Sequence, residues 1–194
     1  MTGAILAGGT SSRMGRDKAL LPWNGKPLIM HAAETLRALF QDVCICGGSG
    51  DRYGFLGLPV LPDLVPRSGP LGGIHTALSY AVPAPVFVLS CDMPLVSRSL
   101  IEYILKFPSS APVKVAAPDG RIQPLCGVYH ASCLPVIEQE LKHRRLKLME
   151  VFARLHGAPV PVGPHLPFYD ERLMMNVNDE QDYRQLTAWT SPDR

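Results

Sequence analysis

The sequence predicts an α/β fold with a mostly parallel β-sheet covered by helices on both faces. Short apolar runs alternate along the chain with segments whose apolar residues recur at helical spacing, and this alternation is typical of βα units. Of the 194 residues, 46% are hydrophobic and 19% are charged, which is ordinary for a globular protein and sufficient for one hydrophobic core. We therefore expect a single domain that spans residues 1–194.

Six short apolar runs are the expected strands. Their near-continuous apolar sequence is what strands show when both of their faces are buried, as in a parallel sheet. The expected strands span residues 3–6, 42–46, 60–61, 86–90, 113–117 and 125–129.

Six longer segments are the expected helices. In the first of them, Ile29, Ala33 and Leu36 fall on one face of a 3.6-residue helix, so we expect that face in the core. The stretches 59–70 and 159–167 are rich in proline and glycine and are expected to be loops. The expected helices span residues 28–39, 71–81, 97–107, 131–143, 146–155 and 180–190.

The charge and the cysteines narrow the class of protein. Nineteen Lys and Arg against 17 Asp and Glu leave a formal charge of +2, which is too small to indicate a nucleic acid or a membrane surface as partner. The chain has no secretory signal pattern and no apolar run of about 18 residues, so we expect a cytoplasmic protein. Five cysteines without CxxC spacing favour buried, reduced thiols over a zinc site or a disulfide framework.

A glycine-rich loop directly after the first strand is the first candidate site. Residues 6–15 read LAGGTSSRMG, and glycines without side chains allow backbone N–H groups to approach a phosphate closely. The loop is neither GxGxxG nor a Walker A motif, because GK[ST] is absent. Arg13 and Lys18 add two cations that suit a triphosphate, although taken alone they also fit a solvated surface pair.

Asp92 is the second candidate. It follows the strand 86–90, and ligands of open α/β sheets bind at the carboxyl ends of the strands. Mg²⁺ often binds through one or two carboxylates together with substrate phosphates, so a single Asp suffices as its protein anchor. The alternative for Asp92 is a helix cap or a turn residue.

Four further segments carry weaker signals. Asp63 lies at a strand end, and the segment Gly69 to Gly73 opens a helix whose N–H groups could approach a base or a phosphate, or could form a plain turn. Residues 176–179 read NVND, which offers two side-chain amides or an ordinary turn. The last segment is basic and could receive phosphates or form a solvated helix end; it contains Arg144, Arg145 and Lys147.

These segments together resemble the molybdenum cofactor guanylyltransferase family, whose members open with the pattern LAGGxSxRMGxDK, matched here from Leu6 to Lys18. Further matches follow in family order and cover nearly the whole chain; they are NGKPL (24–28), GPLGG (69–73), CDMP (91–94), QPL (123–125) and NVN (176–178). The resemblance implies a Rossmann-like, doubly wound fold. It also implies transfer of GMP from GTP to the terminal phosphate of molybdopterin, with release of pyrophosphate.

The resemblance also assigns roles to residues. It implies that Lys18 binds the triphosphate, that Asp63 binds the guanosine part, and that Asp92 holds Mg²⁺. Arg13, with Lys18 and Asp92, is expected in catalysis. The other expected nucleotide contacts are Leu6, Ala7, Gly8, Gly9 and Gly73, and the expected molybdopterin contacts are Arg13, Asn176 and Asn178.

Two departures from the family pattern bear on these roles. Gly47 stands where the family often has an Asn that helps to hold the guanosine, so side-chain recognition of the nucleoside is open at this position. The family tail NxNTPxD reads Asn176 to Asp182 here without Thr and Pro, so the local turn is expected to differ.

Three alternative functions stay open at this point. A related enzyme could transfer CMP to molybdopterin or a nucleotide to a sugar phosphate, although Ala7-Gly8-Gly9 favours guanine by resemblance. A non-catalytic module could instead escort the cofactor to partner enzymes. Transient contacts with proteins that make or accept the cofactor also follow from the resemblance.

Overall fold

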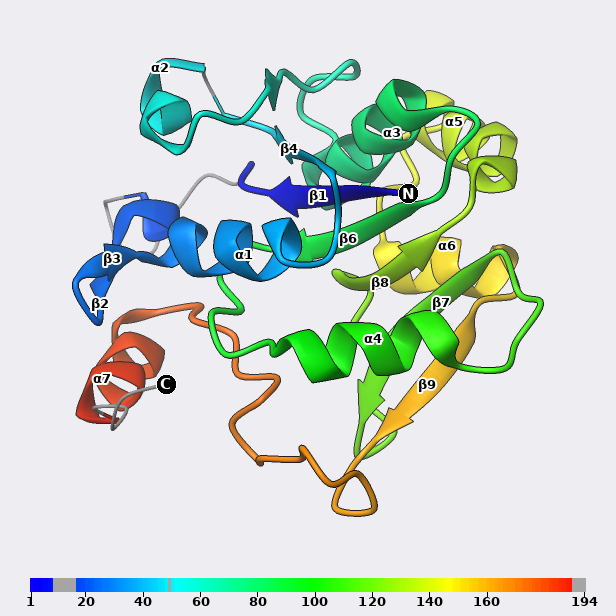
Figure 1. Cartoon of the computed structure of the whole chain (residues 1–194). Coiled ribbons are helices and arrows are strands. Elements are labelled where there is room, and N and C mark those ends of the chain that lie inside the picture. Colours follow the sequence, from blue (N-terminus) through cyan, green and yellow to red (C-terminus); the bar gives the residue numbers. More distant parts are fainter. Residues whose placement is uncertain (9–16, 49, 190–194) are drawn as a thin grey trace.

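A seven-stranded sheet forms the centre of the computed structural model, which describes residues 1–8, 17–48 and 50–189 (Figure 1). Its strand order is β5-β4-β1-β6-β8-β7-β9. The pairing is parallel throughout except for β8, which runs antiparallel to both of its neighbours. The strands are β1 (Thr2–Leu6), β4 (Asp42–Cys46), β5 (Val60–Leu61), β6 (Val86–Ser90), β7 (Val113–Pro118), β8 (Cys126–Tyr129) and β9 (Ala158–Val162).

Helices cover both faces of this sheet, as the resemblance to a doubly wound fold implied. α1 (Leu28–Arg37) and α4 (Arg98–Lys106) pack on one face, and α3 (Gly69–Ala81), α5 (Leu134–Lys142) and α6 (Leu148–Arg154) pack on the other (Figure 1). The alternation of β1 serves both layers, because Ile5 joins the first core cluster while Ala4 and Leu6 join the second. The predicted α/β fold is thereby confirmed.

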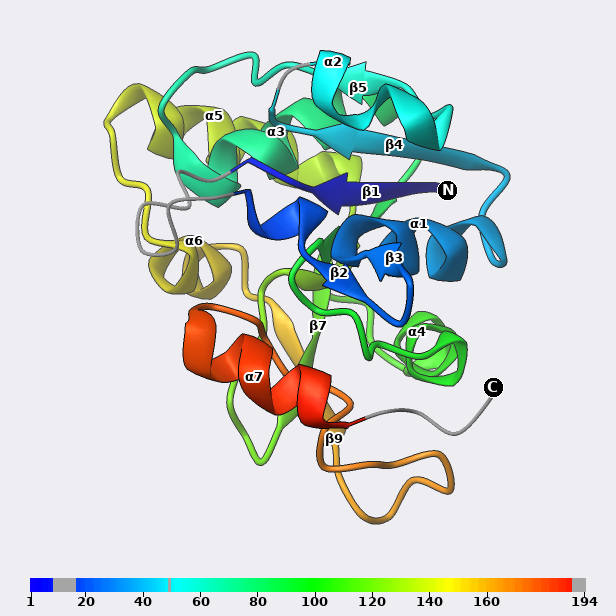
Figure 2. The same ribbon diagram turned by 90° about the vertical axis from the view of Figure 1, so that its left-hand side faces the viewer.

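A third, smaller cluster joins residues 21–28 to the C-terminal part of the described chain. The β2–β3 hairpin (Pro22–Trp23 and Lys26–Pro27) packs against α7 (Glu180–Ala188), and Figure 2 turns this side of the molecule toward the viewer. Tyr183 of α7 donates a hydrogen bond from its hydroxyl to Pro22 O at 2.5 Å. This contact fixes the segment before α7 close to the strand ends of the sheet.

Most predicted elements lie within three residues of the observed ones, but the expected loop at 159–167 is wrong in part. Residues 158–162 form β9, with Val160 and Val162 buried. β9 is an edge strand that pairs with β7 alone. Among the described residues, its other edge has no neighbouring strand to accept hydrogen bonds, so the missing N–H groups of Pro159 and Pro161 cost no hydrogen bond on that edge. Proline is therefore compatible with this strand.

Other short elements were not predicted. The hairpin turn at Asn24 and Gly25 has positive φ at both positions, which is the Asn-Gly turn signal that the sequence contained. The remaining short elements are η1 (Lys18–Leu20), α2 (Gly50–Tyr53), η2 (Gly54–Leu56) and η3 (Ala131–Cys133), of which η3 replaces the start of the expected helix 131–143.

Two further observations concern the cysteines and the lengths of the helices. All five cysteines are free and buried, as expected of reduced core thiols. In the part of the chain that the structure describes, no helix is both long enough and apolar enough to cross a membrane.

Candidate functional site

The parallel strands β4, β1 and β6 end side by side at one edge of the sheet. Backbone hydrogen bonds continue for one residue past the ends of β1 and β6. β1 pairs at Leu6 with Cys46 of β4 and with Ser90 of β6. One residue further on, the Ala7 N–H donates to Cys46 O (2.9 Å) and the Cys91 N–H donates to Leu6 O (3.1 Å). The residues that follow these strands are thereby held in a row, which brings the start of the glycine loop next to the segment of Asp92.

Gly47, which follows β4, lies directly against Gly8 of the glycine loop. A Cβ atom at position 47 would lie 2.5 Å from Gly8 Cα and 2.6 Å from Gly8 N. The φ of Gly47 is also +89°, which L-residues with a side chain rarely adopt. Position 47 therefore requires glycine in this chain, and the departure from the family Asn has a steric reason: this position offers backbone groups only.

Asp63, which follows β5, lies near Gly8 and has one carboxylate oxygen without a hydrogen-bond partner among the described residues. Its Oδ1 is buried and has no hydrogen-bond partner among the described residues, and its Oδ2 lies 3.9 Å from where a Cβ of Gly8 would be. Burial raises the pKa of this carboxyl group. A buried acceptor without a donor is costly, so the position of Asp63 fits a ligand that supplies N–H or O–H groups.

Two glycines bring the first turn of α3 against these residues. A Cβ on Gly73 would lie 3.1 Å from Leu6 Cδ2, and a Cβ on Gly72 would lie 3.8 Å from Asp63 Cγ. The helix start is therefore packed on the ends of β1 and β5. Gly73 lies beside the end of β1, and its observed contact is a packing contact with the Leu6 side chain.

Tyr53 connects the two ends of the glycine loop. Its hydroxyl donates to Asp17 Oδ2 at 3.0 Å and lies 3.3 Å from Ala7 O. Asp17 also accepts from the N–H of Ala19, which caps η1, and lies 3.4 Å from Arg52. Sequence reasoning missed Tyr53, because nothing in the sequence links it to residues 36 and 46 positions away.

Gly48 gives Tyr53 its place. A Cβ on Gly48 would lie 2.8 Å from Cε2 of the Tyr53 ring, and the φ of Gly48 is +79°. Gly47 and Gly48 thus make two different contacts. Gly47 packs against Gly8 of the glycine loop, and Gly48 packs against Tyr53, which contacts both ends of that loop.

Asp92 is partly buried just beyond β6, and several charged groups act on it. Burial raises the pKa of its carboxyl group, and the Asp182 carboxylate adds to the rise. A hydrogen bond from the Ser90 side chain and the positive charge of Lys18 act in the opposite direction. The two residues predicted to act on the phosphates, Lys18 and Asp92, are therefore electrostatically coupled in the structure.

A metal ion at this site would be held by Asp92. The ionised form of Asp92 is disfavoured by burial, so a bound cation would offset that cost. In residues 1–8, 17–48 and 50–189, no group of three or more His, Cys, Asp or Glu residues is arranged to hold a metal. The donor set fits a cation that takes its remaining ligands from substrate phosphates and water, as Mg²⁺ does.

The tail segment 176–178 runs past Asp92. The Val177 N–H donates to Asp92 O at 2.9 Å, and Val177 itself is buried. Asn176 is half-buried and Asn178 is exposed on either side of it. At the start of α7, Asp179 and Asp182 form a capping box, in which their side chains accept hydrogen bonds from backbone N–H groups.

The basic segment favours the structural alternative. Arg145 makes two hydrogen bonds to the buried Glu140, at 2.7 and 2.9 Å, and Lys147 pairs with Glu150 at 3.0 Å. Arg144 donates to Arg67 O at 2.8 Å, in the loop before α3. These cations already have hydrogen-bond or ion-pair partners within the protein, which favours a structural role over binding of a substrate phosphate.

The structure thus brings most of the predicted site residues to one edge of the sheet. Gly9 and Arg13 lie outside the described residues. Those that lie together at the ends of β1, β5 and β6 are Leu6, Ala7, Gly8, Lys18, Asp63, Gly73, Asp92, Asn176 and Asn178.

Comparisons with known proteins agree on the family. Residues 3–158 match the model of the MobA-like NTP transferase domain. A probable molybdenum cofactor guanylyltransferase from Carboxydothermus hydrogenoformans is 37% identical over 96% of this chain and 94% of its own length. Another, from Flavobacterium johnsoniae, is 36% identical over 96% of both chains.

Solved structures share the fold. A putative protein from Aquifex aeolicus superposes with a TM-score of 0.79 at 31% identity, covering 92% of this chain and 94% of its own. Molybdopterin-guanine dinucleotide biosynthesis protein A from Archaeoglobus fulgidus gives a TM-score of 0.82 at 24% identity, covering 97% of each chain. The chain therefore belongs to the molybdenum cofactor guanylyltransferase family, and it is a nucleotidyltransferase.

Proposed function

We propose that this protein transfers GMP from GTP to the terminal phosphate of molybdopterin, with Mg²⁺ held by Asp92. The observation that carries the proposal is the meeting of Lys18, Asp92 and the start of the glycine loop at the ends of β1 and β6. A cation and a metal-binding carboxylate beside a backbone cradle are what a triphosphate needs.

The guanosine part lies on the β1–β4–β5 side in this proposal. The backbone of Leu6, Ala7 and Gly8 faces the nucleotide, with Gly73 at the adjoining helix start, and Gly9 is a further expected contact. The unpaired Oδ1 of Asp63 accepts a hydrogen bond from the nucleoside, which would satisfy a buried acceptor that has no other partner among the described residues.

The phosphates lie between Lys18 and Asp92. Lys18, together with Arg13, stabilises the negative charge that grows on pyrophosphate as it leaves. When bound, Mg²⁺ supplies neutralisation of charge on the α-phosphate. The acceptor phosphate attacks phosphorus in line and needs no side-chain base, because a phosphate monoester is already largely dianionic near pH 7.

Molybdopterin lies on the opposite side of Asp92, where Asn176 and Asn178 flank the residue that bonds to Asp92 O. The low formal charge of +2 supports small-molecule partners rather than nucleic acid. We place the reaction in the cytoplasm, with transient contacts to the proteins that make or accept the cofactor.

Pyrophosphate release with molybdopterin and each of the four nucleoside triphosphates tests the proposal. With molybdopterin present, we expect GTP to be the only one of the four triphosphates that gives pyrophosphate release. For Asp92→Asn we expect kcat to fall by about 10²- to 10³-fold at saturating Mg²⁺. The matched control is Asp42→Asn, an exposed carboxylate at the start of β4, which should retain wild-type turnover.

The other outcomes identify the alternatives. Release with CTP would indicate a cytidylyltransferase, and release with a sugar phosphate in place of molybdopterin would indicate a sugar-phosphate nucleotidyltransferase. GTP binding without any release would indicate a module that escorts the cofactor. Wild-type turnover of Asp92→Asn would remove Asp92 from the reaction.

A further inference from the structure

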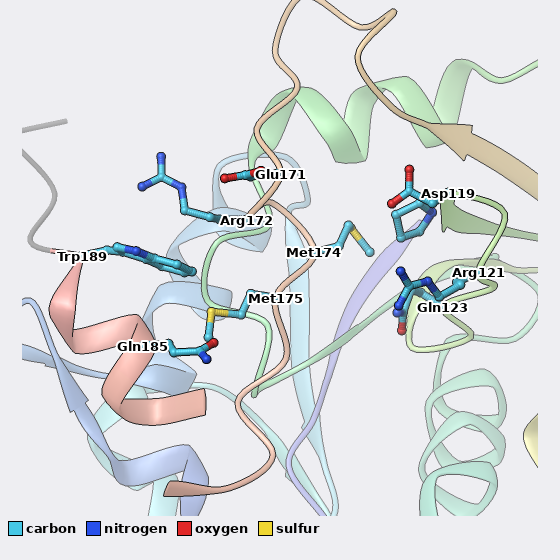
Figure 3. A pocket seen from close by; sticks show the side chains of 10 residues that line it. Asp119, Arg121, Gln123, Glu171, Arg172, Met174, Met175, Gln185 and Trp189 are labelled. Carbon is cyan, nitrogen blue, oxygen red and sulfur yellow. The ribbon is translucent and has the colours of Figure 1, made fainter. Parts of the chain in front are cut away.

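A pocket lined by none of the residues assigned to the nucleotide opens beside the site. It has a volume of about 400 Å³, within the range of about 300–1,000 Å³ for small-molecule sites. Figure 3 shows the turn between β7 and β8 on one side of it, with Asp119, Arg121 and Gln123, and α7 on the other, with Gln185 and Trp189. The segment 171–175 lines it between these two walls.

Two of the lining segments are hydrogen-bonded to the chain around Asp92. In the segment between the walls, Met175 lies two residues before Val177, whose N–H donates to Asp92 O at 2.9 Å. On the β7–β8 wall, Gln123 lies two residues before Leu125, whose carbonyl accepts from the N–H of Ser90, two residues before Asp92, at 2.9 Å. The pocket therefore lies on the β8–β7 side of Asp92, across from the β1–β4–β5 side that holds Gly8, Gly47 and Asp63.

The charges that line the pocket do not suit a polyphosphate. Two carboxylates, Asp119 and Glu171, accompany two guanidinium groups, Arg121 and Arg172, so the formal charges cancel. Arg172 is already bound to the carboxylate of Asp170 through its Nε at 2.7 Å. Its guanidinium carbon lies 5.4 Å from the centre of the Trp189 ring, so it contributes a stacked planar group rather than an available cation.

The other lining groups suit a flat heteroaromatic ring with polar edges. Trp189 offers an aromatic ring, and Met174 and Met175 offer polarisable thioethers that contact aromatic rings favourably. Gln123 and Gln185 carry amides that can donate and accept. Carboxylates pair well with adjacent N–H donors, such as the amino group and ring N–H of a pterin.

We propose that this pocket holds the pterin ring of the acceptor, with Trp189 as its stacking residue and the phosphate directed toward Asp92. This inference rests on the proposed function for the identity of the acceptor. It places the two substrates on opposite sides of Asp92, which is what transfer of a nucleotidyl group at that residue requires.

The first test compares Trp189→Ala with Trp189→Phe by titration calorimetry, using 6-hydroxymethylpterin monophosphate as the probe. Loss of a base–aromatic stack weakens binding by roughly tenfold or more, so we expect that increase in Kd for Trp189→Ala and at most about threefold for Trp189→Phe, which keeps a ring. The KM for molybdopterin should rise in parallel in Trp189→Ala, while the KM for GTP stays within about twofold of wild type.

The second test uses the fact that the chain has two tryptophans. In Trp23→Phe, Trp189 is the sole tryptophan and can be excited selectively. Trp23 belongs to β2 and is buried in the small third cluster, and its Nε1 has no hydrogen-bond partner among the described residues, so the change removes no described side-chain hydrogen bond. We expect the pterin probe to quench Trp23→Phe strongly and saturably. The matched variant Trp189→Phe, in which Trp23 alone reports, should show much weaker quenching.

Each result separates this inference from the proposed function. Unchanged pterin affinity in Trp189→Ala, equal quenching in the two single-tryptophan proteins, or a rise in the KM for GTP alone would overturn the pterin pocket and leave guanylyl transfer intact. Trp189-dependent pterin binding in a protein that releases no pyrophosphate would instead support the pocket and contradict the proposed function.

Discussion

The two sides of Asp92 are built by different parts of the polypeptide. On the β1–β4–β5 side, glycines allow close approach: the backbone of Gly47 touches the backbone of Gly8, and Gly73 lies against the Leu6 side chain. On the β8–β7 side, the pocket is lined by large side chains from three separate segments. A backbone-built site requires glycine at fixed places, whereas a side-chain site tolerates many solutions. The first should therefore be broken by adding one methyl group, and the second by removing a ring.

The largest effect on this comparison is expected from Gly47→Ala. Its Cβ would lie 2.5 Å from Gly8 Cα, and both neighbours are backbone atoms that cannot rotate away. We expect a loss of about 2–4 kcal/mol in the free energy of unfolding, from overpacking and from the positive φ, together with loss of GTP binding. Urea denaturation and GTP titration measure the two effects.

The control for Gly47→Ala is Gly54→Ala. A Cβ at position 54 would meet no atom within 4 Å, so we expect a change within about 0.5 kcal/mol. Should Gly47→Ala fold and bind GTP as the wild type does, the backbone contact with Gly8 would not be what shapes the nucleotide side.

The same contrast explains which features of the fold and of the site could be predicted from the sequence. The parallel sheet, the glycine loop and the strand-end carboxylates were predictable, because backbone approach demands glycine and because parallel strands end at one edge. The sequence left two interpretations of Arg144 open, and its hydrogen bonds to Arg67 O and Ser68 Oγ favour the structural one.

What the sequence could not supply depends on contacts between distant residues. Tyr53 reaches Ala7 and Asp17 across 46 and 36 positions, and no local pattern marks such a contact. Trp189 and Arg121 meet at one pocket only because α7 folds back toward the β7–β8 turn. β9 was missed because its prolines signal a loop unless the strand is known to lie at the edge of the sheet.

A smaller effect is expected from Tyr53→Phe, which tests whether a side chain helps the backbone cradle. The change removes the hydroxyl that bonds to Asp17 and leaves the buried ring against Gly48. A hydrogen bond to a charged group is worth about 1.5–3 kcal/mol at most, so we expect the KM for GTP to rise roughly fivefold or more with little change in kcat. Initial rates at varied GTP measure this.

The effect of Tyr53→Phe should not depend on pH. Burial raises the pKa of Tyr53, so its hydroxyl stays protonated and the ratio of the two KM values should be flat between about pH 6 and 9. Tyr80→Phe, at an exposed position in α3, is the control and should leave the KM unchanged. A fall in kcat with an unchanged KM would contradict a role in positioning the loop that binds GTP.

The smallest effect is expected from Asp63→Asn. This change should raise the stability of the protein without nucleotide and weaken its binding of GTP. Burial raises the pKa of Asp63 in the folded protein above its unfolded value of 3.8. The wild-type protein therefore loses stability as the pH rises from the unfolded pKa through the folded pKa, because Asp63 ionises more readily in the unfolded chain. The Asn variant does not titrate. Without nucleotide it should melt roughly 2–4 °C above the wild type at pH 7, a difference of about 1 kcal/mol, and the difference should shrink near pH 3.

Adding GTP should reverse this order, because the unpaired carboxylate oxygen that weakens the empty protein is the group that accepts from the nucleoside. Thermal melts with and without GTP measure both quantities, with Asp42→Asn as the control. A variant that is less stable at pH 7 and still gains full stabilisation from GTP would show that Asp63 serves the fold. The nucleotide side would then depend on its backbone alone.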